Sequence, residues 1–458
     1  MTQTLLPAAL LERYGKLPLP RYTSYPPANL WGDRDESLLR RALSEIEGRP
    51  LSLYVHVPFC RKLCLYCGCN MLVTRSQDLV TRYLNALDAE VARVAALLPH
   101  RPEVVQVHLG GGTPTYLDEA QLSRLWQSLA SRFDIPRGIE ASIEIHPPVT
   151  SGAQLARLAE LGFSRVSMGV QDFDELVQKR ISRIQPFAQT RDLVVLSRQL
   201  GFVSVNIDLM YGLPLQTVER FAVTLDRVAE LRPDRVALFG YAHMPTLRKH
   251  QSVFRSEELP SVEVRAALFE LAMTRLLGLG YVYVGLDHFA LPDDELLLAR
   301  RQGELRRNFM GYTTCKSSAV LAFGPSSISE LGSHYVQNER EVAAYCDRIE
   351  SGTLPVVRGC SLGRDDLIRR EVIMQLLCNL VLSKHEVSIR HGLDFDTYFA
   401  SELTLLAPLI ADGLCAWEDD ILRILPPGQL LLRTVAAVFD ATLHRPAPRH
   451  HAAAVLLS

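Results

Sequence analysis

The sequence predicts an α/β fold: a partial (β/α)6 barrel followed by a mainly helical, winged-helix-like C-terminal domain. Before residue 340, six apolar, β-branched segments alternate with amphipathic helical stretches, as expected for a parallel sheet covered by helices. Six strand–helix units are fewer than the eight of a closed barrel, so the predicted barrel is open. After residue 340 the alternation ends and helical patterns dominate.

Each predicted strand is a short apolar run that ends at a polar or glycine-rich loop. The strands are expected at residues 51–57, 104–109, 141–146, 165–170, 203–210 and 235–241, with a further strand at 281–289. Helical periodicity marks residues 78–98, 119–133 and 217–231. The C-terminal pattern predicts helices at 364–382 and 394–414, a hairpin at 415–425 and a last helix at 428–443. These helices are mixed in charge, so we expect them to pack or to cover a substrate rather than bind DNA.

The chain of 458 residues carries a net charge of −2, with 48% hydrophobic and 22% charged residues. This balance is typical of a soluble globular protein, and it lacks the broad positive field that nucleic acid or an anionic membrane would need. No run reaches the ~18 apolar residues of a membrane span, and the N-terminal stretch lacks the regions of a secretory signal. We therefore expect a cytoplasmic protein with no nucleic-acid or membrane partner.

Four of the nine cysteines, Cys60, Cys64, Cys67 and Cys69, lie within ten positions of one another. An odd number of cysteines without regular spacing indicates reduced thiols and a metal site rather than a disulfide framework. A structural zinc site would need a second ligand pair, which is missing nearby, and the spacing differs from that of a two-cluster ferredoxin. The thiolates of Cys60, Cys64 and Cys67 could instead hold three irons of a [4Fe–4S] cube and leave one iron open. Cys69 could be a fourth ligand or a nearby functional thiol.

Unusual residues mark the ends of all six predicted strands, and together they predict a common site. The carboxyl ends of parallel strands meet at one edge of a sheet, where active sites of β/α folds lie. Taken singly, each residue has a structural explanation, such as a turn, a helix cap or an ion pair. The features, in strand order, are the cysteine loop, GGGTPT at 110–115, Glu144, Gln171, Asp208 and GYAHMP at 240–245.

The cysteine spacing Cys60-x3-Cys64-x2-Cys67, with Tyr66 before the third cysteine, is similar to the signature of the radical S-adenosylmethionine (radical SAM) superfamily. Over nearly its whole length the chain resembles one family within it, the oxygen-independent coproporphyrinogen III oxidases, also called coproporphyrinogen dehydrogenases. The matching segments are RYTSYPPA (21–28), YVHVPFCRKLCLYCGCN (54–70), HLGGGTPTYL (108–117), RVSMGVQDF (165–173), NIDLMYGLP (206–214), YAHMPT (241–246), DHFALPDDEL (287–296) and NFMGYTT (308–314).

The resemblance implies a [4Fe–4S] cluster and S-adenosylmethionine (SAM), with two SAM molecules, as cofactors. It suggests that the cluster ligands are Cys60, Cys64 and Cys67. The implied contacts of the SAM on the cluster are Tyr54, Gly111, Glu144 and Ile328. Those of the second SAM are Tyr66, Gly112, Thr113, Gln171, Arg183, Asp208 and Ala242. The positions implied to be needed for catalysis are Tyr54, His56 and Cys69.

The family converts two propionate side chains of coproporphyrinogen III to vinyl groups, which gives protoporphyrinogen IX in heme biosynthesis. We expect a monomer that receives electrons from an unidentified donor such as a flavodoxin or ferredoxin. Three parts are expected: an N-terminal segment over the active site (1–48), a catalytic barrel (49–340) and a C-terminal helical domain (341–458). Because the substrate carries four carboxylates, we expect Arg21 to anchor one of them.

Two alternatives stay open at this point. One is a diverged paralogue that acts as a heme chaperone or modifies heme, although the RYTSYP segment and Cys69 favour the oxidase. The other is an iron–sulfur or zinc protein with a structural or electron-transfer role, which would leave the residues at the strand ends unexplained. The chain departs from the family pattern at Pro27, His146, Met310 and Cys315, and these departures concern the substrate pocket.

Overall fold

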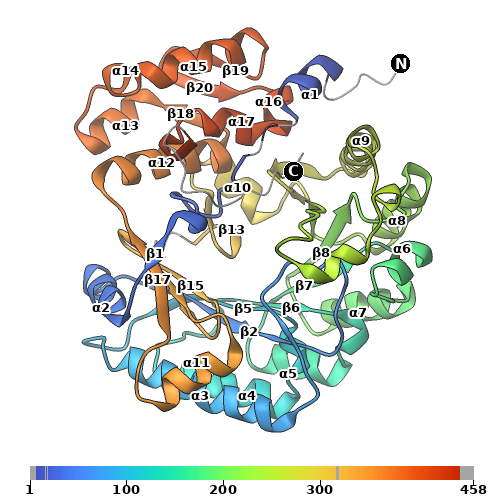
Figure 1. The fold of residues 1–458 in the computed structure, drawn as a ribbon, viewed down its shortest axis with the longest axis vertical. Helices are drawn as coiled ribbons and strands as arrows, with labels where there is room; N and C mark the ends of the chain where they lie inside the picture. The colour runs from blue at the N-terminus through green and yellow to red at the C-terminus, as the bar shows by residue number, and fades with distance from the viewer. Residues whose placement is uncertain (1–6, 16, 18, 316–318, 444–458) are drawn as a thin grey trace.

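The computed structural model describes residues 7–15, 17, 19–315 and 319–443. The predicted parallel sheet is confirmed, and its six strands are neighbours in chain order. They are β2 (Leu51–Val57), β5 (Val104–Gly111), β6 (Glu140–Ile145), β7 (Arg165–Gln171), β8 (Ser204–Tyr211) and β9 (Arg235–Gly240). Helices cover their outer side (Figure 1). These are α3 (Gln77–Ala95), α4 (Glu119–Ala130), α5 (Gly152–Glu160), α6 (Glu175–Arg180), α7 (Phe187–Gln199), α8 (Val218–Leu231) and α9 (Val262–Gly278).

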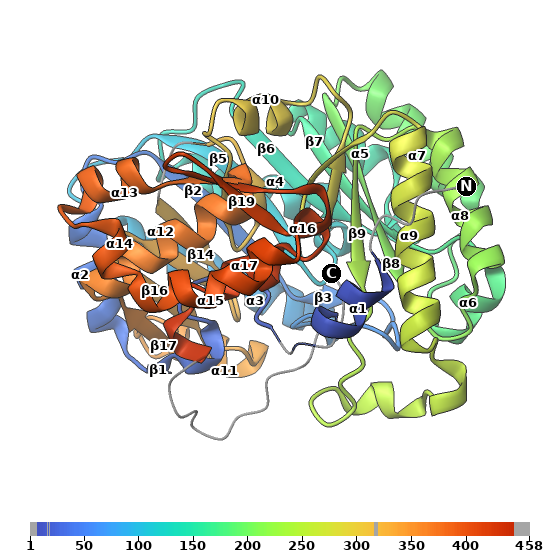
Figure 2. The same cartoon turned by 90° about the horizontal axis from the view of Figure 1, so that it is seen from above.

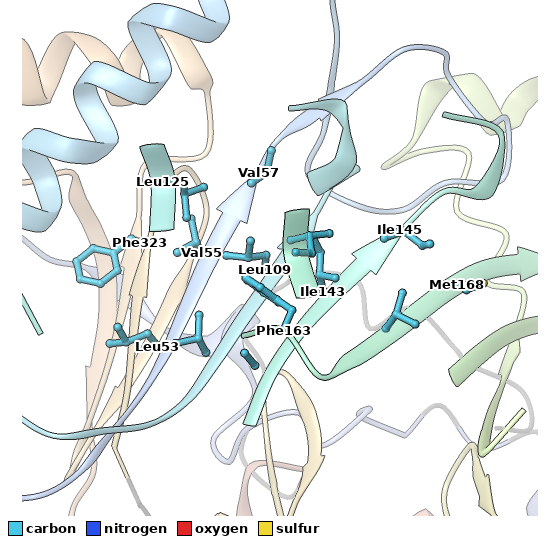
Figure 3. Close-up of a cluster of buried hydrophobic side chains, with 14 of the residues drawn as sticks. Leu53, Val55, Val57, Leu109, Leu125, Ile143, Ile145, Phe163, Met168 and Phe323 are labelled. Atoms are coloured by element: carbon cyan, nitrogen blue, oxygen red, sulfur yellow. The ribbon is translucent and has the colours of Figure 1, made fainter. Parts of the chain in front are cut away.

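The outward faces of these strands form the main core. Figure 3 shows side chains of successive strands, among them Leu53, Val55 and Ile143, packed together with Leu125 of α4. Leu53, Val55 and Ile143 are fully buried, and each such side chain contributes about 1.5–3 kcal/mol on leaving water. Because side chains alternate along a strand, the intervening residues, such as Tyr54 and Glu144, point to the inside of the barrel.

The sheet extends well beyond the six parallel strands on both sides. On one side β14 (Ala319–Phe323) runs parallel to β2, a pairing that the sequence did not predict. The antiparallel strands that follow are β15 (Ile328–Leu331), β16 (His334–Asn338), β17 (Val356–Ser361) and β1 (Gly32–Asp33). Among the described residues this sheet has 13 strands and stays open. Helices α2 (Glu36–Glu45) and α11 (Val342–Glu350) pack on this part of the fold.

The single strand expected at 281–289 is wrong, because two short strands occupy this stretch. They are β10 (Val282–Gly285) and β11 (His288–Ala290), an antiparallel pair of which β11 also pairs with β9. Leu286 adopts a left-handed conformation with φ 48°, which turns the chain between them. An apolar, β-branched run cannot reveal such a turn, because Leu rarely adopts this conformation. Beyond the turn lie α10 (Glu295–Arg301) and a second hairpin of β12 (Arg306–Asn308) and β13 (Gly311–Thr313).

The C-terminal part has the winged-helix-like order that the sequence predicts, with an additional strand. Its elements are α12 (Arg364–Asn379), β18 (Val381–Ser383), α13 (Lys384–His391), α14 (Phe395–Tyr398), α15 (Ala400–Ala411), β19 (Cys415–Glu418) and β20 (Ile421–Ile424). The hairpin β19–β20 is confirmed, and β18 pairs with β20. Leu380 ends α12 in a left-handed conformation with φ 60°, so the helix stops short of residue 382. The last helix is broken into α16 (Pro426–Leu430), α17 (Leu432–Ala437) and a short 3-10 turn (Ala441–Leu443).

The N-terminal segment joins the C-terminal part to the large sheet. Figure 1 and Figure 2 both show α1 (Ala8–Tyr14) beside the C-terminal helices, where Arg13 forms an ion pair with Asp412 at 2.8 Å. Tyr22 lies in the core of the C-terminal part and donates its hydroxyl hydrogen to Asp440 at 3.0 Å. After it the chain reaches β1, which pairs with β17. The segment therefore passes across the inside of the barrel between two packed units.

Candidate functional site

The cysteine loop begins directly after β2 and is closed at its base by two short strands. Strand β3 (Phe59–Cys60) pairs with β4 (Leu72–Val73), so the residues between them form a compact loop. Within it Cys67 donates its backbone N–H to the carbonyl oxygen of Cys64 at 3.0 Å. All nine cysteines are free, and Cys60, Cys64 and Cys67 are half-buried. The loop thus holds three accessible thiols at the carboxyl edge of the sheet.

A cavity of about 470 Å³ lies beside this loop and collects most of the predicted site residues. Those that line it are Arg21, Cys60, Cys64, Tyr66, Cys67, Cys69, Gly111, Gly112, Thr113, Glu144, Gln171, Arg183, Asp208 and Ala242. The three others, Tyr54, His56 and Ile328, line a neighbouring cavity of about 140 Å³. The structure therefore places every predicted site residue on one of two neighbouring cavities. It does not place Tyr54, His56 and Ile328 on the wall shared with the cysteines.

The glycine loop after β5 is shaped by close approaches that no other residue permits. A Cβ on Gly111 would lie 2.8 Å from the His56 ring, and the residue has φ +119°, a conformation that favours glycine. A Cβ on Gly112 would lie 2.8 Å from the carbonyl carbon of Pro58. Because the backbone lies bare against the cavity, its polar groups are available to a ligand.

Glu144 projects from β6 into the same cavity. Its carboxylate accepts the backbone N–H of Gly111 at 3.1 Å, and the imidazole of His108 lies 3.4 Å away. Burial favours a raised pKa for Glu144, but the hydrogen bonds from His108 and Gly111 outweigh it and hold the pKa below its ordinary value. The side chain stays 45% exposed because it faces the cavity. Glu144 is therefore an ionised acceptor poised for a ligand.

His108 connects Glu144 to Tyr54, and the sequence reading did not single it out. Its ring stacks on Tyr54 with centroids 5.8 Å apart, and its Nδ1 lies 2.6 Å from the hydroxyl of Ser142. The one feature that could have identified His108 as a site residue is its position on β5, two residues before the glycine run. A histidine in an apolar strand is more often a core residue, so its role depends on the neighbouring strands.

His56 fixes the far end of the cysteine loop. Its Nε2 lies 2.8 Å from the carbonyl oxygen of Asn70, and its Nδ1 lies 3.1 Å from the hydroxyl of Tyr54. Burial lowers the pKa of His56, which favours the neutral ring. This pattern assigns an Nε2–H that donates to Asn70 and an Nδ1 that accepts from Tyr54. His56 thereby links β2 to the residue that follows Cys69.

The cysteines differ in their electrostatic surroundings. Hydrogen bonding from Cys69, whose backbone N–H lies 3.4 Å from the sulfur of Cys67, lowers the pKa of Cys67 to about 6. Burial raises the pKa of the Cys60 thiol to about 11. The thiolate is the form that binds a metal, so the loop favours the ligating form at Cys67 before iron is present.

Arg183 closes the cavity beneath the cysteine loop. It donates from Nη1 to the sulfur of Cys64 at 3.5 Å and from Nη2 to the carbonyl oxygen of Gly169. Its buried Nε has no hydrogen-bond partner among the described residues. The buried Nε2 of His146 is likewise unpartnered there, and burial together with Arg183 lowers the pKa of His146 to about 2. Both residues line the cavity, so a ligand bound there could supply the hydrogen-bond partners that these two atoms need.

Asp208 and Gln171 complete this wall. Burial, followed by the charge of Glu144, raises the pKa of Asp208 to about 7, although Asn206 donates to it at 2.7 Å. Gln171 has φ 71°, at a point where the register between β7 and β8 shifts. A left-handed conformation in a non-glycine residue is strained and is often associated with function. Both residues are placed as the strand-end argument predicts.

A segment after β9 supports the cysteine loop from the other side, and no sequence pattern singled it out. His250 Nε2 lies 2.8 Å from the carbonyl oxygen of Cys67, and Gln251 donates to that of Tyr66 at 2.9 Å. Arg248 donates to the carbonyl oxygen of Gly68. His250 and Gln251 lie in a 3-10 helix (Lys249–Val253) that Arg248 directly precedes, and so short an element leaves no periodic pattern in the sequence.

The residues present fit an iron–sulfur cluster better than a single metal ion. Among the described residues, no group of three or more His, Cys, Asp or Glu side chains lies close enough together to hold one metal ion. A zinc ion, for example, forms bonds of about 2.3 Å to sulfur. A [4Fe–4S] cube binds each thiolate through a different iron, so its thiols stand farther apart. The three thiols on an open loop, the bare glycine backbone and the unpartnered Nε of Arg183 match that larger group together with a polar ligand.

The departures from the family pattern lie at different distances from this site. His146 lines the main cavity and Met310 the neighbouring one. Pro27 is half-buried in the N-terminal segment, and Cys315 is a half-buried free thiol that lines neither cavity. Separately, none of the helices among the described residues has the length and apolar character needed to cross a membrane.

Comparisons with known proteins agree with this geometry. The model of the radical SAM superfamily matches residues 54–228, and that of the HemN C-terminal domain matches residues 362–431. The oxygen-independent coproporphyrinogen III oxidase of Salmonella typhimurium is 44% identical over 440 residues, which cover 96% of each chain. That of Synechocystis is 42% identical over 443 residues, which cover 95% of each.

A solved structure agrees over the same length. It is described as "Coproporphyrinogen III oxidase (HemN) from Escherichia coli is a Radical SAM enzyme", with a TM-score of 0.92 and 42% identity. The match covers 96% of this chain and 100% of that one. Because relatives this similar align with nearly the whole chain, and the cysteine loop lies at the carboxyl edge of the same fold, the chain belongs to the oxygen-independent coproporphyrinogen III oxidase family of the radical SAM superfamily.

Proposed function

We propose that this protein converts two propionate side chains of coproporphyrinogen III to vinyl groups by oxidative decarboxylation, giving protoporphyrinogen IX in heme biosynthesis. The observation that carries the proposal is the cavity of about 470 Å³ shared by the cysteine loop, the glycine loop with Glu144, and Arg21. Its walls offer thiols for a cluster, backbone and carboxylate groups for SAM, and a cation for a carboxylate-bearing substrate.

The reaction starts at an unactivated C–H bond, which no side-chain acid or base can break near pH 7 at a useful rate. When bound, the [4Fe–4S] cluster and SAM supply the radical chemistry that removes this hydrogen atom. The residues of the chain bind and orient these groups. We assign Cys60, Cys64 and Cys67 as the cluster ligands, which leaves one iron free for the amino-acid part of SAM.

Two sets of residues are assigned to SAM. Tyr54, Gly111, Glu144 and Ile328 serve the molecule on the cluster, where the ionised Glu144 accepts hydrogen bonds and His108 couples it to Tyr54. The second molecule is assigned to other residues of the main cavity, where Arg183 offers a cation and Asp208 an acid with a pKa of about 7. These residues are Tyr66, Gly112, Thr113, Gln171, Arg183, Asp208 and Ala242. His56 and Cys69 are assigned to turnover, since both hold the end of the cysteine loop.

The finer features of the protein follow from the same proposal. Reduction of the cluster needs a one-electron donor such as a flavodoxin or ferredoxin. We infer that the protein is a monomer. We place it in the cytoplasm, because nine free cysteines suit a reducing compartment. The division into a covering segment (1–48), a barrel (49–340) and a C-terminal domain (341–458) is part of the proposal. Beyond residue 340, α11 still packs on α3, and β17 still pairs with β16 in the large sheet.

The proposal is tested by an anaerobic assay of the full-length protein with a reconstituted cluster, SAM, a chemical reductant and coproporphyrinogen III. The expected products are protoporphyrinogen IX, methionine and 5′-deoxyadenosine. SAM cleavage without a vinyl product, or tight heme binding without turnover, would identify a heme chaperone or heme-modifying paralogue instead. Met310 lines the neighbouring cavity of about 140 Å³ and a further cavity of about 250 Å³, and it is the departure that would then explain the altered substrate.

A further inference from the structure

Three arginines from separate parts of the chain gather around Asp287 beside the main cavity. Arg433 of α17 forms an ion pair with Asp287 at 3.5 Å, and both side chains are 7% exposed. Arg307 of β12 donates to the carbonyl oxygens of Tyr22 at 2.8 Å and Arg21 at 3.4 Å. Arg21 lies in the N-terminal segment and lines the cavity itself. The cluster therefore joins all three parts of the fold at one wall.

The positive charge at this wall is not balanced locally. Neither Arg21 nor Arg307 forms an ion pair among the described residues. Burial lowers the pKa of Arg21, and the negative charge of Asp287 raises it. The positive charges of Arg433 and Arg307 lower the pKa further. The buried Oδ1 of Asp287 also lacks a hydrogen-bond partner within the described part of the chain. The side chain of Arg21 is exposed and lines the cavity, and that of Arg307 is half-buried. An anion that enters the cavity can therefore reach a guanidinium whose charge no carboxylate offsets.

Other arginines inside the barrel show the opposite arrangement. Arg165 lies 2.6 Å from Glu295, and Arg235 lies 2.7 Å from Asp294 and 2.9 Å from Glu295. Their side chains are 16% and 14% exposed, between the 7% of Arg433 and the exposed Arg21, and both are paired with carboxylates. The excess of positive charge is thus a property of the wall at Arg21 and not of the barrel interior in general.

Space for a large ligand continues from this wall. A second cavity of about 250 Å³ shares Glu144, Asp208 and Phe239 with the main one, and His288 and Tyr312 border it. The guanidinium of Arg307 lies 5.7 Å from the centre of the Tyr312 ring, so the cluster lies next to both cavities. An acid held at Arg21 would occupy the same space as a group that reacts near the cysteines.

We propose that this cluster is a carboxylate site for the substrate, in which Arg21 contacts a propionate of the porphyrinogen. Arg307 and Arg433 are positioning residues: they hold Arg21 and its segment and keep the wall positive. Asp287 limits the excess charge in the empty site. The inference rests on the proposed function for the identity of the ligand. A guanidinium fork matches a carboxylate with two parallel hydrogen bonds, which an ammonium group cannot reproduce.

The test is a binding titration that needs no turnover. Full-length protein with a reconstituted cluster is titrated with coproporphyrin III, the stable fluorescent form of the tetrapyrrole, without SAM or reductant. Arg21→Ala should raise the Kd about 10-fold or more, the scale of one lost hydrogen bond to a charged group. The Kd of Arg21→Lys should lie between those of the unaltered protein and Arg21→Ala. Arg191→Ala removes a half-exposed arginine from the surface of α7 and is the matched control, expected to bind as the unaltered protein does.

Asp287→Asn gives a result of opposite sign. Removal of the counter-charge should lower the Kd about threefold, since the empty site becomes more positive. A purely structural cluster would instead lose thermal stability in this variant with no gain in porphyrin affinity. An Arg21→Ala protein that binds coproporphyrin III within about twofold of the unaltered protein would overturn the inference. So would an equal loss of affinity in Arg191→Ala.

The failure of this inference can be told apart from failure of the proposed function. If the unaltered protein makes protoporphyrinogen IX while Arg21→Ala and Arg21→Lys bind and turn over normally, the function stands and the carboxylate site is wrong. If the unaltered protein forms no vinyl product but loses coproporphyrin III affinity on Arg21→Ala, the site stands and the reaction is wrong.

Discussion

The carboxylate of Glu144 accepts the backbone N–H of Gly111 at 3.1 Å, which ties the glycine loop after β5 to the end of β6. A Cβ on the preceding residue, Gly110, would lie 3.1 Å from the same carboxylate. The position of Glu144 therefore depends on the absence of a side chain on the neighbouring strand. Four predictions follow from this and three other features of the site and its surroundings.

Gly110→Ala should displace the Glu144 carboxylate and weaken SAM binding about 10-fold, the cost of one disturbed charged hydrogen bond. Equilibrium binding of SAM to the reconstituted protein measures the effect. Gly278→Ala at the end of α9 is the control, because a Cβ there meets nothing within 4 Å. SAM affinity unchanged in Gly110→Ala would show that Glu144 does not contact this cofactor.

Alanine at Cys60, Cys64 or Cys67 should abolish the iron content and the visible absorbance of the reconstituted protein, because each removes one thiolate ligand. Cys69→Ser should keep the iron, because a fourth thiolate would block the iron that SAM must reach and Cys69 is therefore not a ligand. The same variant should lose turnover. Cys360→Ala, at a half-buried thiol on β17, is the control for loss of a cysteine. Iron loss in Cys69→Ser as severe as in Cys64→Ala would make Cys69 a ligand.

Arg183→Lys should weaken SAM binding about 10-fold while the cluster remains. The three N–H groups of an ammonium diverge from one nitrogen, so they cannot match the planar spread with which Arg183 donates from Nη1 to Cys64 and from Nη2 to Gly169 and keeps its Nε–H for a ligand. Measured iron content and SAM affinity separate the two effects, and Arg191→Lys on α7 is the control. Loss of iron together with SAM affinity would mean that Arg183 serves the loop rather than the ligand.

The pH dependence of stability should report on Glu90, which is buried on α3 beneath the sheet. Burial raises its pKa to about 7, although Tyr345, Gly324 and Asn338 donate hydrogen bonds to it. The protonated form is favoured in the folded protein, so its contribution is fully present below the unfolded pKa, which lies near 4.5. It is lost as the pH rises through the folded pKa.

Between pH 5 and 8 the unaltered protein should therefore lose up to about 3 kcal/mol of stability relative to Glu90→Gln, whose side chain stays neutral. Thermal unfolding of both proteins across this range checks the expectation. Parallel stability profiles would show that Glu90 keeps an ordinary pKa. Glu47→Gln serves as the control, because Glu47 is exposed and its contact with water changes little on folding.

Much of the site could be predicted from the sequence because its residues stand at the ends of strands. Cys60, Glu144, Gln171 and Asp208 each lie toward the carboxyl end of an apolar run or just after it, and the carboxyl ends of parallel strands share one edge whatever the details of the loops. Local periodicity is sufficient for such a prediction. It also placed the six parallel strands within a residue or two of their observed ends.

The tertiary structure decided what depends on pairing between distant segments. No local pattern shows that β14 closes on β2, that Leu286 turns the chain into a hairpin, or that His108 lies between Tyr54 and Glu144. The same holds for the cluster of Arg21, Arg307 and Arg433, whose members come from three parts of the chain. Their proximity is set by how the N-terminal segment and the C-terminal helices pack on the barrel. The sequence by itself determined the type of chemistry through short motifs, whereas long-range packing determined which charges meet and therefore where the substrate is held.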